Sequence, residues 1–254
     1  NYVLLLNLKM EILSNSHFYN KDFIIFGHRG VPELCPENTI ESFQKAIDLN
    51  YSGIELDLMQ TSDNKLIVHH DDTALINNKL TPISELNLCQ LHECYPNIPV
   101  LEDLLDSIGH KTNINIEIKS QDSRSALMVE KTIKLLKKFN LIDSIIISSF
   151  NPKLIKESKK IDDRFATGWI LGPKNLYFYS QWKIILKYFR VNAIHVNHNC
   201  ISNSLINQIH SYNMKVLSYT VNSDKTLNEL IIKKIDGIFT DSPRILKISK
   251  SLTK

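Results

Sequence analysis

Two acidic side chains on one face of a predicted strand are the first chemical feature of this chain. Glu55 and Asp57 stand two residues apart within the largely apolar run of residues 53–58. Because side chains alternate along a strand, both carboxylates project from one face and the apolar residues take the other. Two adjacent carboxylates repel each other unless a positive charge lies between them. All-oxygen ligands of this kind predict a divalent cation, calcium or magnesium rather than zinc.

The segment that follows returns a histidine to these acids. Residues 62–64, Ser-Asp-Asn, predict a turn. A connection this short holds no crossover helix, so residues 66–70 are expected to return antiparallel to the first strand. A turn centred near residue 63 or 64 brings His70 roughly opposite Asp57, beside the metal. His69 alternates with His70, faces the other way and is assigned a structural role.

Strand-like and helix-like segments alternate along the rest of the chain. Residues 23–28 are almost wholly apolar, as in a strand buried on both faces. Asn38 and Glu41 stand at the N-cap and N3 positions of a capping box, which predicts a helix to about Asn50. With the carboxylate strand this makes a right-handed βαβ unit. Further strands are expected at 114–119, 144–150, 165–171, 193–197, 215–222 and 237–241, and helices at 100–109, 123–139, after 152, 177–189, 202–212, 224–233 and the C-terminal end.

Eight parallel-type strands in about 250 residues predict an α/β fold, a (β/α)8 TIM barrel with a short cap insertion after strand 2. A doubly wound open sheet is the alternative, but no glycine-rich phosphate turn supports it. Residues 1–22 are expected to form an N-terminal extension and residues 23–254 a single barrel domain, with 71–99 as the short cap segment.

A barrel places catalytic groups at the carboxyl ends of its strands. Glu117 and Lys119 repeat the two-residue spacing of the first acids and therefore share a face. We expect three carboxylates to meet two histidines and two cations at one mouth. These residues are His28, Arg29, Glu55, Asp57, His70, Glu117 and Lys119.

Several motifs in this order resemble those of the glycerophosphodiester phosphodiesterases. They are His28-Arg-Gly30, Pro36-Glu-Asn-Thr39, Glu55-Leu-Asp57, His70-Asp71 and Glu117-Ile-Lys119, followed by Ser148-Ser-Phe150, Tyr219-Thr-Val-Asn222 and Asp236-Gly-Ile-Phe-Thr-Asp241. The resemblance covers roughly residues 23–244, nearly the whole chain.

The resemblance implies a role for each matching residue. It makes Glu55, Asp57 and Glu117 the ligands of one divalent cation, Mg²⁺ or Ca²⁺, and His28 and His70 the acid and base, in an order that stays open. It makes Arg29 and Lys119 the phosphate-binding cations. The implied reaction is metal-dependent hydrolysis of glycerophosphodiesters to glycerol 3-phosphate and an alcohol. The glycerol 2-hydroxyl attacks phosphorus, and a cyclic phosphate is the intermediate. Such an enzyme serves lipid and glycerol metabolism.

Two departures from the family pattern concern the substrate. Tyr219 stands where the family usually has Trp, which keeps an aromatic wall and changes its shape. Leu75-Ile-Asn-Asn78 replaces an Arg-Thr-Thr run, so the cap is expected to be small. A lysophospholipase D or sphingomyelinase-D-like lipid phosphodiesterase is the first alternative, which an exposed apolar rim would support. A non-catalytic binding barrel is the second, which the loss of a histidine or a carboxylate would favour.

Composition excludes several partners. The chain of 254 residues is 43% hydrophobic and carries a net charge of only +3, with lysines spread over predicted helices, so no nucleic-acid partner is expected. The apolar run of residues 2–8 is too short for a signal peptide or a stable membrane insertion. Met10 is a candidate natural start, which would leave the N-terminus without a targeting function. The four cysteines form no CxxC pair, which favours a reducing, cytoplasmic location. The expected partner is a small-molecule substrate, and the oligomeric state stays open.

Two further histidines receive predictions. His195 is assigned a structural role, and His198 is placed near the upper rim, where contact with substrate is an open alternative.

Overall fold

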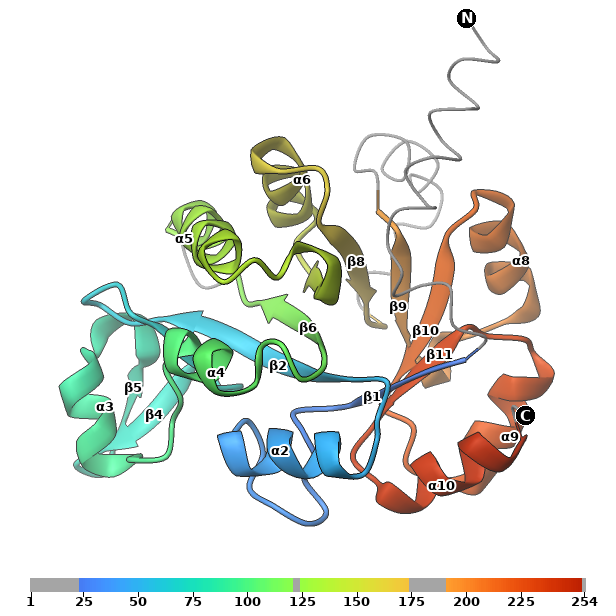
Figure 1. Cartoon of the computed structure of the whole chain (residues 1–254), viewed down its shortest axis with the longest axis horizontal. Coiled ribbons are helices and arrows are strands. Elements are labelled where there is room, and N and C mark those ends of the chain that lie inside the picture. The colour runs from blue at the N-terminus through green and yellow to red at the C-terminus, as the bar shows by residue number, and fades with distance from the viewer. Residues whose placement is uncertain (1–22, 121–123, 174–190, 253–254) are drawn as a thin grey trace, which may run out of the picture.

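The computed structural model describes residues 23–120, 124–173 and 191–252 (Figure 1). The expected N-terminal extension and the helix predicted at 177–189 lie outside these ranges.

Eight parallel strands close into a barrel. β1 pairs in parallel with β11 on one side and with β2 on the other, so the sheet has no free edge at this seam. The predicted (β/α)8 barrel is confirmed, and the open-sheet alternative is wrong. In order around the barrel the strands are β1 (Ile24–Gly27), β11 (Gly237–Thr240), β10 (Lys215–Tyr219), β9 (Ala193–Asn197), β8 (Ala166–Leu171), β7 (Ile145–Ser149), β6 (Asn113–Ile118) and β2 (Gly53–Gln60).

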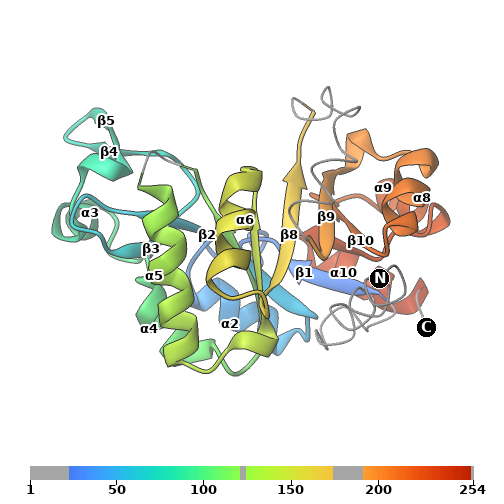
Figure 2. The same cartoon turned by 90° about the horizontal axis from the view of Figure 1, so that it is seen from above.

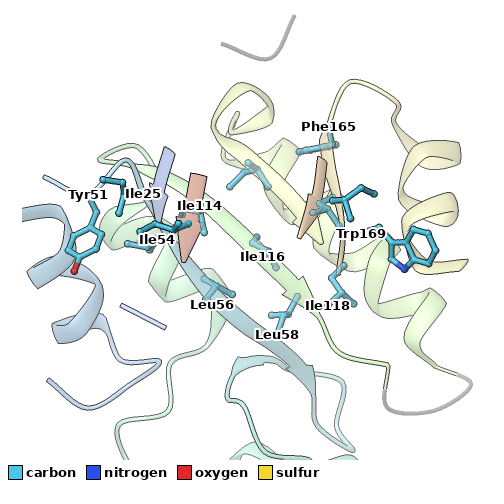
Figure 3. Packing of buried hydrophobic residues seen from close by; sticks show 14 of the residues in the cluster. Ile25, Tyr51, Ile54, Leu56, Leu58, Ile114, Ile116, Ile118, Phe165 and Trp169 are labelled. Carbon is cyan, nitrogen blue, oxygen red and sulfur yellow. The ribbon is translucent and has the colours of Figure 1, made fainter. Parts of the chain in front are cut away.

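Helices cover the outer face of the barrel (Figures 1 and 2). They bury the outward-pointing side chains, which on β2 and β6 are Ile54, Leu56, Leu58, Ile114, Ile116 and Ile118 (Figure 3). Because the helices bury the outer face, the outward-pointing residues of the strands are nearly all apolar, whereas the inward-pointing residues can be polar. The helices are α2 (Ile40–Asp48), α4 (Leu101–Ile108), α5 (Ser125–Lys138), α6 (Pro152–Ile161), α8 (Asn203–Ser211), α9 (Asp224–Ile232) and α10 (Pro243–Leu252), with short 3-10 turns η3 (Ile142–Ser144) and η5 (His198–Cys200).

The start of α2 differs from the prediction. Thr39, not Asn38, is the N-cap, and its side chain accepts a hydrogen bond from the amide of Ser42. Asn38 has a φ of 56° and is 4% exposed, so it lies before the helix and points inward. Asn and Thr are both good N-cap residues. Asn38 does not cap this helix because its side chain makes a contact in the site instead.

The strand β2 runs past the two acids, which had been expected at its carboxyl end. It continues to Gln60 and pairs antiparallel with β3 (Leu66–Val68), so the two acids lie within the strand and not at its end. The antiparallel return is confirmed, but its register is one residue from the prediction. The amide of His69, not His70, donates to the carbonyl of Asp57, at 3.0 Å. His70 is the next residue beyond this pair.

A small cap follows β3. Its hairpin, β4 (Thr73–Ile76) and β5 (Lys79–Pro82), turns through Asn77 and Asn78, whose φ angles of 48° and 61° are those of the tight turn that favours Asn. The 3-10 turn η2 (Ile83–Glu85) and the helix α3 (Leu88–Cys94) complete the cap. A separate apolar cluster, which includes Met59, Ile67, Ala74, Ile83 and Leu91, fixes the cap to β2 and β3.

The lower half of the barrel interior is filled by apolar side chains. The rings of Phe26 and Phe239 stack with centroids 4.9 Å apart, among Ile24, Ile146 and Leu217. Within the described residues, apolar side chains therefore close the lower end of the barrel interior.

Candidate active site

A cavity of about 340 Å³ lies at the carboxyl ends of the strands. All eight residues that sequence analysis assigned to the site line it, so the structure brings them together. They are His28, Arg29, Glu55, Asp57, His70, Glu117, Lys119 and Tyr219.

Three carboxylates form a compact group on one side of this cavity. Glu55, Asp57 and Glu117 each offer an oxygen, and these atoms lie within 4.8 Å of one another. Asp57 on β2 lies beside Glu117 on β6 in the parallel register, which is what places them on one face. Lys119 Nζ lies 2.7 Å from Asp57 Oδ1 and 2.8 Å from Glu117 Oε1. One ammonium group thus offsets part of the charge of three acids.

The acids differ in how burial and neighbours act on them. Burial, and then the charge of Asp57, raise the pKa of Glu55 to about 8. Burial also raises the pKa of Glu117, and the charge of Lys119 does not cancel this. Burial opposes the charge of Asp57 too, but Lys119 and Arg29 outweigh it and hold the Asp57 pKa below its usual value.

This donor set fits a divalent metal ion. Three buried carboxylate oxygens within reach of one another are hard ligands, which suit Mg²⁺ or Ca²⁺ and not a thiophilic ion. Burial, and after it the charge of Asp57, raise the pKa of Glu55 and Glu117, so a bound cation would favour the charged form of both carboxylates.

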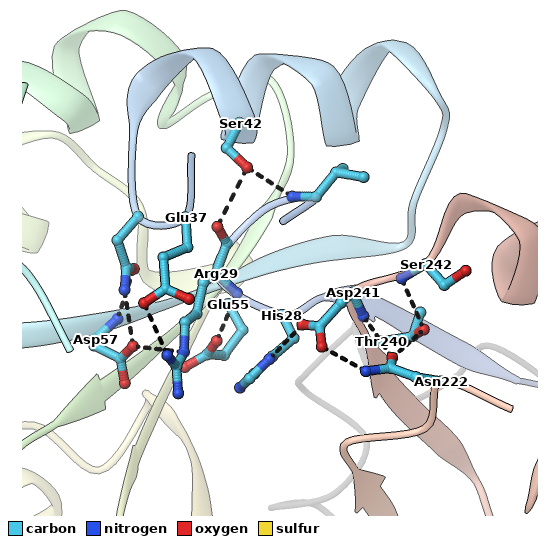
Figure 4. A network of polar contacts seen from close by, with 12 residues as sticks. His28, Arg29, Glu37, Ser42, Glu55, Asp57, Asn222, Thr240, Asp241 and Ser242 are labelled. Carbon is cyan, nitrogen blue, oxygen red and sulfur yellow. Dashed lines mark hydrogen bonds and ion pairs between the residues drawn. The ribbon is translucent and has the colours of Figure 1, made fainter. Parts of the chain in front are cut away.

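The loop after β1 holds Arg29 over the acids (Figure 4). The backbone amide of Arg29, with φ at 55°, donates to Glu55 Oε2 at 2.9 Å. Its guanidinium pairs with Glu37 at 2.9 Å and lies 3.2 Å from Asp57 Oδ2. Asn38 Nδ2 donates to the same Asp57 oxygen at 2.9 Å. Neither Glu37 nor Asn38 was predicted to be a site residue, although both lie in the motif Pro36-Glu-Asn-Thr39.

His28 is held by the last strand's end. Its Nδ1 lies 2.7 Å from Asp241 Oδ1, and Asn222 Nδ2 donates to the other oxygen of Asp241 (Figure 4). Burial lowers the pKa of His28, but the Asp241 hydrogen bond and the Glu55 charge outweigh it, so the pKa lies above its ordinary value. With Nδ1 engaged, Nε2 is the nitrogen left for proton transfer. Asp241 and Asn222 had been quoted only as parts of the resemblance.

His70 enters from the start of the cap. Its Nδ1 lies 2.8 Å from Asp71 Oδ1, and its side chain is 36% exposed. His69 does not line this cavity; it lines a second one with Glu37 and Asn38, and its ring lies 6.2 Å from that of Tyr95. The two histidines therefore serve different surfaces, as the alternation predicted.

Aromatic and apolar side chains form the wall opposite the acids. The hydroxyl of Tyr219 donates to the carbonyl of Leu171 at 3.0 Å, and its ring meets Phe150 edge-on with centroids 6.2 Å apart. Ile170 and Phe239 continue this wall inward. His198 also lines the cavity, with Nδ1 3.4 Å from the carbonyl of Tyr219.

Residues 28–245 match the Glycerophosphoryl diester phosphodiesterase family. This chain belongs to that family. It is 30% identical over 236 residues to a glycerophosphodiester phosphodiesterase of Caldanaerobacter subterraneus subsp. tengcongensis, an alignment that covers 88% of this chain and 96% of that protein. The predicted family, and with it the prediction of a phosphodiesterase, is confirmed.

Solved structures agree with the fold of this phosphodiesterase. An Oleispira antarctica phosphodiesterase in complex with the product sn-glycerol-3-phosphate superposes with a TM-score of 0.81 at 22% identity, over 93% of this chain and 99% of that one. A glycerophosphodiester phosphodiesterase of Thermotoga maritima gives 0.76 at 24% identity, over 89% and 98% of the two chains.

Two polar residues deep in the phosphodiesterase cavity were missed by sequence analysis as site residues. Asn115, which lies beside Glu55 on the neighbouring strand, and His195 both line it, and each is 1% exposed. Among the helices of this phosphodiesterase that the structure describes, none has the length and hydropathy needed to span a bilayer.

Proposed function

We propose that this phosphodiesterase hydrolyses glycerophosphodiesters to glycerol 3-phosphate and an alcohol, with one divalent cation at Glu55, Asp57 and Glu117. The observation that carries the proposal is the convergence of three buried carboxylates, two cationic side chains and two histidines on one cavity. The product found with the Oleispira antarctica relative supports the choice of substrate.

The charges of the site are suited to a phosphodiester anion. A bound Mg²⁺ or Ca²⁺ would supply positive charge that polarises the phosphoryl oxygens. Arg29 and Lys119 bind and orient the phosphate from the two sides of Asp57, with which both already pair. Positioned cationic and hydrogen-bonding groups stabilise the charge that develops in the transition state, and removing one typically lowers the rate by about 10²–10³-fold.

The two histidines move the protons. One takes the proton of the glycerol 2-hydroxyl as its oxygen bonds to phosphorus; the other gives a proton to the alcohol oxygen as its bond to phosphorus breaks. The roles then reverse: a water loses a proton and bonds to phosphorus, and the 2-oxygen leaves with a proton. The cyclic phosphate opens to glycerol 3-phosphate.

The apolar hairpin of the cap favours one alternative. Leu75 and Leu80 face each other across β4 and β5 and are 51% and 66% exposed. An acyl chain could lie against such a surface, so lysophospholipase D activity on 1-acyl lysolipids, which keep the 2-hydroxyl, is the second candidate. A non-catalytic barrel has no comparable support, because every proposed catalytic group is present.

The setting of the enzyme is part of the proposal. Residues 23–254 would act as one barrel domain with 71–99 as its cap, in lipid and glycerol metabolism, on a small-molecule substrate. Four free cysteines accord with the reducing cytoplasm.

Metal dependence is tested by chelation. Purified protein assayed on glycerophosphocholine should lose activity in chelator and regain it with calcium or magnesium. Glu55→Gln keeps the size of the side chain and removes its charge, so it should need far more metal. Full activity in chelator would remove the metal from the proposal. Faster turnover of lysophosphatidylcholine than of glycerophosphocholine would favour the second candidate.

The nucleophile is tested by a substrate analogue. Glycerophosphocholine should react, its 2-deoxy analogue should be inert, and phosphorus NMR should detect a cyclic phosphate. Comparable hydrolysis of both would show that water attacks directly, which contradicts the proposed histidine roles.

A further inference from the structure

Two residues that line the catalytic cavity, outside the proposed catalytic group, each carry a buried polar atom without a partner within the described part of the chain. These atoms are Oδ1 of Asn115 and Nε2 of His195. Both residues line the same cavity as the metal-binding carboxylates, and neither belongs to the proposed catalytic group. Buried polar atoms are nearly always satisfied, so each unsatisfied one needs an explanation.

The strand register places Asn115 beside Glu55 and below Asp57 and Glu117. Asn115 pairs with Glu55, and two residues further along the strand Glu117 pairs with Asp57. Asn115 therefore lies about 5 Å deeper along the barrel axis than Glu117, because strands rise about 3.3 Å per residue and tilt by about 36° to that axis. Its Nδ2 lies 3.0 Å from Ser148 Oγ. In either orientation of the Asn115 amide, one of its two polar atoms hydrogen-bonds Ser148 and the other has no partner.

The position of His195 is built into the barrel. A Cβ added at Gly168 would lie 2.4 Å from Cε1 of His195, so the ring occupies space that only glycine at 168 leaves. On another side the ring packs against Phe239, with centroids 4.9 Å apart. Burial lowers the pKa of His195 to about 3, so the ring is neutral at ordinary pH and its free nitrogen can exchange one hydrogen bond with a hydroxyl.

The shape of the cavity decides which half of the substrate reaches Asn115 and His195. The stacked rings of Phe26 and Phe239 close the barrel below them, so only a small group fits. The leaving alcohol can be large and must depart through the mouth. The glycerol half is small and constant, and its terminal hydroxyl lies one carbon beyond the 2-hydroxyl. Ile170 and Phe239 offer apolar contact to the carbon chain.

We propose that Asn115 and His195 bind the terminal hydroxyl of the glycerol moiety and so make the enzyme specific for glycerol over diols that lack it. This rests on the proposed function. A site built to hydrogen-bond a hydroxyl discriminates against an analogue without it, because its buried polar groups are then left unpaired.

The test compares two substrates that both keep the 2-hydroxyl nucleophile. These are glycerophosphocholine and its 1-deoxy analogue, 2-hydroxypropyl phosphocholine. For the metal-loaded wild-type enzyme we expect kcat/KM to be about 10- to 100-fold higher for glycerophosphocholine. Asn115→Leu and His195→Phe keep similar volumes and remove the polar atoms. Each should reduce this preference to within about three-fold, mainly by slowing glycerophosphocholine.

The control is Asn113→Leu. Asn113 lies on the same strand, two residues further from the mouth, and does not line the cavity. The Asn113→Leu variant should leave the ratio of kcat/KM for the two substrates unchanged. Thermal unfolding of all variants separates loss of fold from loss of recognition.

Calorimetry gives a second readout that needs no turnover. Glycerol 3-phosphate should bind the wild-type enzyme about 10-fold or more tightly than 2-hydroxypropyl phosphate, and the Asn115→Leu and His195→Phe variants should bind both alike. Equal kcat/KM for the two substrates in the wild type would overturn the inference. So would variants that lose activity on both substrates equally, or an ordered water that stays in the floor of the cavity unchanged when the hydroxyl is absent. If the wild type hydrolyses neither substrate, the proposed function fails. The calorimetric preference alone then decides whether Asn115 and His195 bind the terminal hydroxyl.

Discussion

His28 Nδ1 lies 2.7 Å from Asp241 Oδ1, although the two residues are 213 positions apart. His28 follows β1 and Asp241 follows β11, and these strands pair where the barrel closes. Closure of the barrel therefore orients a proposed catalytic imidazole. Asn222 in turn fixes Asp241 by donating to its second oxygen and accepting from its backbone amide.

Asp241→Asn should lower kcat and shift the pH profile. Burial lowers the pKa of His28, and the Asp241 hydrogen bond and the Glu55 and Asp241 charges raise it above its ordinary value. Removing the Asp241 charge therefore lowers the His28 pKa, and the limb of the profile due to His28 moves to lower pH. We expect kcat to fall about 10-fold or more. A shifted acid limb would make His28 the base, and a shifted alkaline limb would make it the acid. Unmoved limbs would show that Asp241 only supports the fold.

His70→Ala should lower kcat about 10²-fold or more, the usual contribution of a positioned acid or base. His69→Ala is the matched control, because His69 is adjacent in sequence but lines a different cavity. It should change kcat only a few-fold. Steady-state assays of both variants, at saturating metal, make the comparison. Equal losses would mean that the facing of these two histidines is wrong.

Much of the fold followed from local patterns. Apolar strands alternating with amphipathic helices predicted the barrel, and the two-residue spacing of Glu55 and Asp57 predicted their shared face. The turn before β3 is centred on residue 63, within the predicted range, because the amide of Thr61 pairs with the carbonyl of Lys65. This centre places His69, the residue before His70, opposite Asp57. A difference of half a residue in the turn centre decides whether residue 69 or 70 lies opposite Asp57.

Contacts between distant segments could not be predicted in this way. The Asp241 contact of His28 depends on the register of β1 against β11 and on the direction of both side chains, which local patterns do not encode. His195 was assigned a structural role because a lone histidine in an apolar strand has no visible partner in sequence. Its place in the cavity depends on the space left by Gly168 on the neighbouring strand.

Asn38 and Thr39 should separate metal binding from helix stability. Asn38 donates to Asp57, a proposed ligand, whereas Thr39 caps α2. Asn38→Ala should weaken calcium or magnesium binding about 10- to 100-fold, the usual effect of losing a group that orients a ligand. Thr39→Ala should lower the free energy of unfolding by about 1 kcal/mol and leave metal affinity unchanged. Calorimetric metal titration and urea unfolding measure the two quantities. Equal metal affinities of the two variants would contradict this assignment of Asn38.

His195 should make the fold sensitive to acid. Burial lowers its pKa to about 3 in the folded protein, whereas an unfolded chain takes up the same proton near pH 6.5. Between these values the unfolded state binds more protons, so the stability present above pH 6.5 is lost as the pH falls, by up to about 1.4 kcal/mol per pH unit from this group. His195→Phe should remove that slope. The measurement is the free energy of unfolding in urea at several pH values from 7.5 to 4.5, without metal. His110→Phe, at a solvent-exposed histidine, controls for the loss of an imidazole. The free energy of unfolding of the wild type should fall more steeply with decreasing pH than that of His195→Phe. Parallel curves would show that His195 becomes protonated within the fold.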